Sequence, residues 1–394
     1  MTFSKPRRGD GSRIPYLVTV PKYYALASEV ATMALLRSSG LPIPEVYGYS
    51  PSPDNAAETE YITRNYEKAI VSITRQIAEL DSNMMLNGSP AGGSLYYTKD
   101  LEKISGKPGI KLEDGTFCIG PDTRLHLWFG RRSQLDMDRG PYKSVEAALV
   151  AGAHKERAYL EKFGRPLLPF ERVRREAYEY QKQSPLEHIE NLDRYLHIAP
   201  SLIRKNPILS HFCMRHSDLQ PAKPKLGEMQ EIYRRRLVHY HYVVNTAKYN
   251  KLHYMTLTEP MALSRFRLFS ASSDMWGGET RPLKVPLIHA TERWKEFTGD
   301  DAPCPIAFDA EDVARTEKFD ETQRGANENI ETLRNIIGCG EDSWVPAEHY
   351  FEAMAFCNKM KEDGMALAEA DPEKVLEEMT AHWPFNDMDE TEYI

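Results

Sequence analysis

The sequence predicts an α+β protein in which a small β-containing domain, residues 1–65, precedes a large and mainly helical domain, residues 66–394. Strand-forming and helix-forming patterns alternate before residue 62, and a helical spacing of apolar side chains begins near residue 70. The chain has 394 residues, of which 41% are hydrophobic. This is enough to supply a sizeable core.

The first domain is predicted to run strand, helix, strand, strand. Residues 14–20 are rich in β-branched and aromatic types, which favour a strand. A helix with Ser28 near its start follows and ends at Gly40, just before two prolines. Short strands are expected at 46–49 and 59–62.

The second domain opens with a change of period. Ile70, Ile73, Ile77, Leu80 and Met84 alternate spacings of three and four, which places them on one face of a helix. Further helices are predicted at 144–163, 170–182, 186–196, 227–252, 259–272, 282–298, 309–337 and 346–381. The exceptions are a Gly/Pro-rich stretch at 88–93, a small hairpin around 94–97 and 117–119, and a loop at 130–141.

Composition narrows the function classes. The formal charge is −8, spread over 50 basic and 58 acidic residues, so neither a nucleic-acid footprint nor a membrane-attracted surface is expected. The run Arg234–Arg236 fits either an anion site or a solvated helix face. No stretch approaches the eighteen or so apolar residues that span a bilayer. The five cysteines are scattered, which favours a reducing, intracellular compartment.

A candidate catalytic motif lies near the middle of the chain. His216, Ser217, Asp218 and Leu219 follow an apolar run that ends at Met214. Protein kinases use H-R-D-L-x-x-x-N, where the aspartate orients the acceptor hydroxyl and the asparagine holds a metal ion. A bare His-x-Asp is common by chance, so the motif alone is weak.

Several segments together are more specific than that motif. Residues 214–221, Met-Arg-His-Ser-Asp-Leu-Gln-Pro, resemble the catalytic loop of the aminoglycoside phosphotransferase superfamily, in its altered-inheritance-of-mitochondria branch. The other segments that resemble this branch, in the same order along nearly the whole chain, are 27–33, 43–49, 59–62, 93–97, 117–123, 138–142 and 382–385.

The resemblance implies a bilobal protein-kinase-like fold. Residues 1–65 would be a truncated N-lobe on the nucleotide-binding side, and residues 66–394 would be the helical C-lobe. It also implies an ATP- and magnesium-dependent transfer of phosphate to a small-molecule hydroxyl, with no protein partner specified. A mitochondrial location follows from the branch, and a cytoplasmic one is the alternative.

Carried over position by position, the resemblance makes Asp218 the catalytic base, with His216 in the same loop. Glu29 matches the helix glutamate that pairs with the phosphate-binding lysine; without the resemblance it could equally be an exposed helix acid. Arg13 stands at the lysine-type position, although its planar guanidinium is not interchangeable with an ammonium. Lys22 is the second candidate for this role.

Two departures from the family pattern bear on activity. Lys223 stands five residues after Asp218, where the family has asparagine, and no aspartate occurs between Asp218 and Asp274 to serve as the second metal ligand. A second segment, the nucleotide-base hinge, is missing after Ile62. No metal ligand is therefore assigned.

The departures leave three readings open. Without its metal ligands, a phosphotransferase loses several kcal/mol of transition-state stabilisation, whereas a lone base supplies only about 10² to 10⁴-fold. The chain is then an impaired phosphotransferase, or a non-catalytic pseudokinase that acts through its surfaces. The third reading is that coding sequence was skipped at both gaps.

Overall fold

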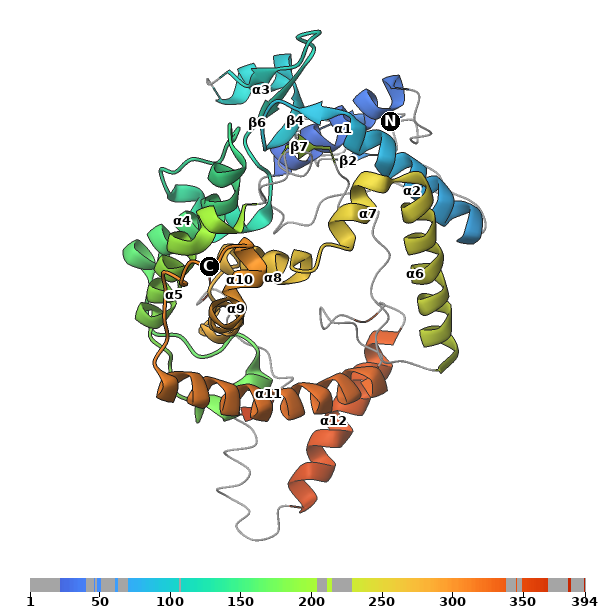
Figure 1. Ribbon diagram of the computed structural model, residues 1–394. Helices are drawn as coiled ribbons and strands as arrows, with labels where there is room; N and C mark the ends of the chain where they lie inside the picture. Colours follow the sequence, from blue (N-terminus) through green and yellow to red (C-terminus); the bar gives the residue numbers. More distant parts are fainter. Residues whose placement is uncertain are drawn as a thin grey trace.

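The protein is mainly helical and carries a few small antiparallel sheets (Figure 1), so the α+β prediction is confirmed. Its structure here is a computed structural model. The residues that it describes are 22–39, 46, 48–50, 61–62, 70–105, 108–203, 211–214, 229–337, 345, 349–367, 382–383 and 393.

The largest described sheet packs against the first helix. Strands β4 (Ser94–Tyr97), β6 (Phe117–Gly120) and β5 (Ile110–Lys111) are antiparallel in the order β4-β6-β5. Helix α1 (Lys22–Ser38) lies against β4 and buries Ala31 in the same apolar cluster as the strands. The predicted pairing of 94–97 with 117–119 is confirmed, but α3 (Thr98–Ser105) and β5 lie between the two strands in the sequence, so they belong to a three-stranded sheet rather than to a hairpin.

Close side-chain packing against the backbone explains Gly120 in this sheet. A Cβ on Gly120 would lie 2.8 Å from the ring of Tyr96, which is fully buried. Because real Cβ contacts are longer than this, only glycine fits beside the ring.

Two further pairs of short strands are antiparallel. Strand β1 (Tyr49–Ser50) pairs with β2 (Tyr61–Ile62), and β3 (Gly88–Ser89) pairs with β7 (Phe212–Cys213). The second pair joins positions more than a hundred residues apart in the sequence, and it fixes where the chain enters residues 215–228. Helix α3 (Thr98–Ser105) connects β4 to β5.

The main core lies among four helices. These are α4 (Val145–Phe163), α5 (Pro185–Ile198), α8 (Ala262–Ser273) and α9 (Arg281–Glu292). They enclose fully buried side chains such as those of Leu192, Tyr195, Leu268, Leu283 and Leu287. The short helix α10 (Trp294–Thr298) adds Trp294 and Phe297 to this core.

The remaining long helices pack outside this core in two groups (Figure 1). Helix α2 (Ile70–Leu86) packs along α6 (Met229–Tyr249) and α7 (Lys251–Leu257). Helix α11 (Ala310–Ile337) contacts α9 and then α12 (Tyr350–Leu367). The short 3-10 helices are η1 (Leu125–Leu127), η2 (Gly130–Gln134), η3 (Arg172–Arg174), η4 (Glu176–Tyr178) and η5 (Ala199–Leu202).

Three predicted helices are wrong in detail. The helix at 170–182 is replaced by η3 and η4, because Glu179 and Tyr180 adopt left-handed backbone angles (φ 50° and 54°) that end helical hydrogen bonding. The helix at 227–252 breaks at Asn250, whose side chain caps the restart at α7. The helix at 282–298 breaks at Arg293 (φ −111°, ψ 25°), where α9 ends and α10 begins.

Other expectations have more limited outcomes. Helices close to the predicted ranges are present at α1, α2, α4, α5, α8 and α11, and α12 occupies part of 346–381. The strand expected at 14–20 lies outside the described residues. The division at residues 65 and 66 stays a prediction.

Candidate functional site

Most of the predicted catalytic residues lie outside the part of the chain that the structure describes. These are Arg13, His216 and Asp218. Lys22 is the first residue of α1, but its side chain is also outside the described set. Glu29 is described, and it is a partly buried residue in the first half of α1.

The described flanks bring α1 close to the entry of the predicted catalytic loop. Met214, the residue immediately before 215–228, packs against Leu36 of α1 and against Met84 of α2. It also contacts the cluster that contains Ala31. The helix that carries Glu29 and the chain that leads into Arg215–Asp218 therefore share one apolar core.

Close packing also holds β7, the strand before the loop. A Cβ on Gly92 would approach the ring of Phe212 to 2.5 Å, so the backbone at Gly92 has to remain bare. This contact and the pairing of β7 with β3 anchor the start of the loop.

A fully buried ion cluster lies in the helical core. The Glu156 carboxylate accepts hydrogen bonds from Arg132 Nη2 (2.6 Å) and Nε (2.8 Å) and from Lys155 Nζ (2.8 Å). The backbone N–H of Trp276 donates a fourth, at 2.7 Å. Lys155 also donates to the carbonyl oxygen of Ser273, at 2.9 Å, which joins α4 to the end of α8.

The charges of this cluster depend on one another. Burial alone would raise the pKa of Glu156, but the Lys155 ammonium and the Arg132 guanidinium lower it to about 2. Burial lowers the pKa of Lys155, and the Glu156 carboxylate opposes that effect. Removing one partner would leave a buried charge without compensation.

A pocket of about 330 Å³ opens between η4, α5, α9 and α11. Its aromatic wall comes from Tyr178, Trp276 and Phe319, and the Tyr178 and Phe319 rings lie 4.7 Å apart between centroids. This volume lies at the lower end of the range typical of small-molecule sites.

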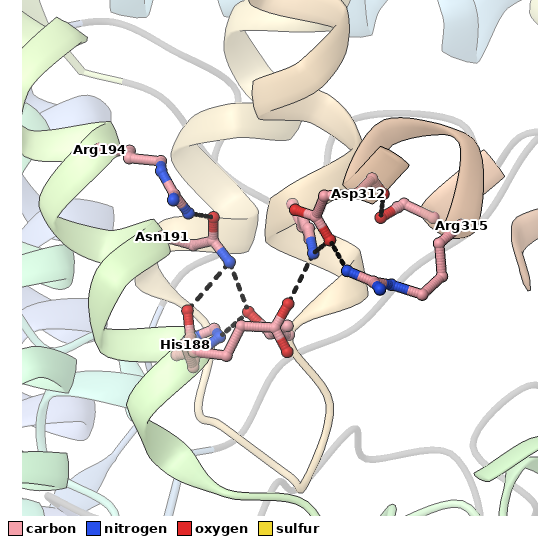
Figure 2. A network of polar contacts seen from close by, with 9 residues as sticks. His188, Asn191, Arg194, Asp312 and Arg315 are labelled. Carbon is pink, nitrogen blue, oxygen red and sulfur yellow. Dashed lines mark hydrogen bonds and ion pairs between the residues drawn. The ribbon is translucent and has the colours of Figure 1, made fainter. Parts of the chain in front are cut away.

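A chain of ion pairs, part of which is drawn in Figure 2, involves residues that line the pocket. Lys284 of α9 donates to Glu187 of α5 (2.7 Å) and to Asp312 of α11 (2.8 Å). Asp312 also accepts from Arg315, at 2.9 Å. Because Lys284 is largely buried and bonded to two helices, its ammonium fixes α5 and α11 relative to α9.

A second set of polar contacts includes Thr280, which lines the pocket. Thr280 Oγ1 lies 3.1 Å from His188 Nδ1 and accepts from Asn191 Nδ2 at 3.2 Å (Figure 2). The Arg194 guanidinium donates to the side-chain oxygen Oδ1 of Asn191, at 2.8 Å. Burial lowers the pKa of His188 to about 4, so this imidazole is neutral near pH 7.

The part of the chain that the structure describes contains neither a metal-ligand cluster nor a membrane-spanning helix. No group of three or more His, Cys, Asp or Glu side chains lies close enough together in these ranges to hold a metal ion. None of the helices described is both long and apolar enough to cross a membrane.

No protein-family model matches the chain, and no solved structure matches it. Two curated proteins, from two strains of Aspergillus fumigatus, are similar to it. Each is 23% identical to this chain, over an alignment that covers 96% of the chain and 92% of the relative. Both are named subtelomeric hrmA-associated cluster proteins.

The length of these alignments is informative. Each runs over 493 positions, whereas this chain has 394 residues, so at least 493 minus 394, or 99, positions have no residue of this chain. The relatives therefore carry segments that this chain lacks.

The pocket and the ion cluster had no signal in the sequence. Glu187, Lys284 and Asp312 come from three helices separated by up to 125 positions, and their spacing matches no motif. Lys155 and Glu156 read as ordinary helix-surface charges, because Lys and Glu are almost never fully buried unless paired. Their burial is explained by partners distant in the sequence, which are Arg132, the Ser273 carbonyl oxygen and the Trp276 N–H.

Proposed function

We propose that the chain has a bilobal kinase-like fold and is an aminoglycoside-phosphotransferase-type protein whose phosphoryl transfer is impaired. One observation supports this proposal. Met214 packs against the helix that carries Glu29, and the predicted loop Arg215–Asp218 follows Met214 directly in the sequence. In the family, a loop base and a helix glutamate serve the same reaction. The location that goes with this proposal is mitochondrial, with a cytoplasmic one as the alternative.

The roles of the chain's own residues follow from that assignment. Asp218 would orient the acceptor hydroxyl of a small molecule and take its proton, and His216 would shape the loop. Glu29 would position Arg13 or Lys22 against the phosphates of ATP.

The residues present do not fit a magnesium ion. Lys223 stands at the asparagine position, and no aspartate occurs between Asp218 and Asp274. The described ranges also hold no acidic or histidine cluster that could replace these ligands. We therefore derive no step through the metal, and we expect the transfer rate to be low.

Exposed apolar side chains favour the second candidate, a non-catalytic pseudokinase that binds other proteins. On α12, Tyr350, Phe351 and Met354 are 50%, 80% and 41% exposed. Phe266 of α8 is 62% exposed. Large exposed aromatic side chains are typical of interaction surfaces rather than of a solvated helix face.

Turnover with ATP distinguishes these candidates. The assay measures ATP hydrolysis with and without magnesium, for the wild type, for Asp218→Asn and for Asp301→Asn, an exposed aspartate of a surface ion pair. We expect slow hydrolysis that Asp218→Asn removes and Asp301→Asn leaves unchanged. Hydrolysis that survives Asp218→Asn would contradict the role of the base. No ATP hydrolysis by any of the three proteins would favour the pseudokinase.

The third reading is tested on the transcript. If the chain itself lacks the two family segments, the transcript reads without interruption across codons 62 to 66 and 221 to 228. In-frame coding sequence inserted at either place would restore the missing hinge or metal-ligand segment, and the impairment would then no longer be expected.

A further inference from the structure

None of the residues that line the pocket between α5, α9 and α11 belongs to the predicted catalytic set. Strand β7, which enters that loop, lies beside β4 and α1, whereas α9 and α11 lie in the opposite part of the molecule (Figure 1). The inference below therefore does not depend on the proposed function.

The charges in the pocket wall are mainly positive. Arg281, Lys284 and Arg315 line it, and Glu187 is the carboxylate among the lining residues that the structure describes. The carboxylates of Asp312 and Asp320 pair with these cations but are not part of the lining. Each of the three cations is thus already in an ion pair, and a ligand can add an acceptor only for their remaining N–H groups.

The polar atoms without partners in this wall are donors. Within the described part of the chain, Trp276 Nε1 and Arg281 Nε have no hydrogen-bond acceptor. By contrast, the hydroxyl oxygens of Ser184 and Thr280 are already used, since Ser184 caps α5 and Thr280 contacts His188. Both nitrogens are themselves buried, so an acceptor reaches them only through a shift of these side chains, and a donor would gain nothing there.

Aromatic side chains give the ligand its other property. Tyr178, Trp276 and Phe319 offer ring faces and edges to a flat apolar body. The pocket's volume of about 330 Å³ accommodates one or two fused rings.

We propose that this pocket binds a small aromatic carboxylate, with its ring against the aromatic wall and its carboxylate toward Lys284 and Arg281. A carboxylate supplies the acceptors that the wall lacks and complements its cations. An aromatic cation of the same shape would face three positive side chains and would bring further donors. A neutral aromatic alcohol would gain only the ring contacts.

The test compares three probes with one ring and different charges: benzoate, benzamidine and benzyl alcohol. Binding is followed by saturation-transfer NMR and by calorimetry on the full chain. For a ligand of this size a Kd of about 1 mM is expected. We expect benzoate to bind at least about tenfold more tightly than benzamidine, with benzyl alcohol between them.

Three variants locate the site. Arg315→Gln and Trp276→Phe should weaken benzoate about three- to tenfold, through loss of a cation and of a donor. Arg293→Gln is the matched control, because Arg293 also forms an exposed pair with an acid three positions away, Glu296, but lies outside the pocket. It should leave the Kd unchanged. Arg315 is 70% exposed, so its replacement does not threaten folding.

Several outcomes would overturn the proposal. Binding of benzamidine as tight as that of benzoate would exclude an anion site. Unchanged benzoate affinity in both Arg315→Gln and Trp276→Phe would place the ligand elsewhere. Absence of benzoate binding up to about 10 mM would exclude the site altogether.

Discussion

Arg132 and Glu156 form a two-hydrogen-bond pair, at 2.6 and 2.8 Å, in which both side chains are fully buried. The guanidinium also lies 3.7 Å from the centre of the Tyr159 ring. Such a pair is expensive to desolvate, and it is retained here with two further donors on the same carboxylate. The helical core is thus organised around a charge.

Glu156→Gln should destabilise the protein by about 3–5 kcal/mol, because Arg132 and Lys155 would remain buried without a compensating anion. Urea unfolding followed by circular dichroism measures this loss. Glu161→Gln is the control, since Glu161 is 49% exposed and pairs with Arg157 on the surface of the same helix. Its effect should stay within about 0.5 kcal/mol. Equal effects of the two substitutions would contradict the structure.

His188 should make stability depend on pH. Burial lowers its pKa from 6.5 to about 4, so the unfolded chain takes up a proton at a higher pH than the folded chain does. The stability tied to neutral His188 is present above pH 6.5 and is lost as the pH falls toward 4. Between about pH 7.5 and about pH 5 the loss should be about 2 kcal/mol.

The measurement is the unfolding free energy at these two pH values, for the wild type and for His188→Gln. The variant should show the smaller decrease, although His126, whose pKa is also lowered to about 4, continues to contribute. An identical decrease in both proteins would refute the assignment.

Gly152→Ala should destabilise the contact between α4 and α8. The added Cβ would lie 2.3 Å from Ser273 Oγ and 2.9 Å from its Cα, so backbone as well as side chain would have to move. A cost of about 1–3 kcal/mol is expected in thermal or urea unfolding. Gly325→Ala in α11 is the matched helical control, because nothing lies within 4 Å of its Cβ. That change should stabilise by about 0.5–1 kcal/mol.

Asn250→Ala should cost about 2–3 kcal/mol, since it removes two buried contacts at once. Its side-chain oxygen caps α7 at the His253 N–H (3.0 Å), and its amide nitrogen donates to Asp81 (3.2 Å). Ser144→Ala removes an exposed cap from α4 and should cost about 1 kcal/mol or less. Urea unfolding of both variants is the comparison, and a ranking in the reverse order would speak against the α6–α7 geometry.

Local pattern was sufficient for much of the fold. The apolar spacing that includes Ile77, Leu80 and Met84 predicted α2, and the glycines and aromatic residues near 94–97 and 117–119 predicted the pairing of those two strands. Helix breaks were missed where one residue decides them. Asn250 caps the restarted helix at the nearby His253 N–H, but its side chain is also held by Asp81, 169 positions earlier in the sequence.

Burial of polar residues could not be predicted in the same way. Thr74 and Asp81 of α2 are both 2% exposed, although the apolar spacing placed neither on the inner face. Their partners Asn245 and Asn250 stand about 170 positions away. Single-sequence periodicity counts apolar side chains and therefore cannot detect a face that is stabilised by such pairs.

The predicted catalytic residues show a different limit. His216, Asp218 and Arg13 were proposed from a resemblance, and the structure describes only their neighbourhood, at Met214 and α1. Their roles remain predictions. The pocket, in contrast, has a described geometry but no sequence pattern.

Trp276 belongs to both of the sites described above. Its backbone N–H is held by Glu156, while its indole ring forms part of the pocket wall. Loss of the hydrogen bonds to the Glu156 carboxylate would therefore loosen that wall first, at a temperature below that of global unfolding. Indole fluorescence would report this partial melting, because Trp276 couples the pocket wall to the ion pairs of the core.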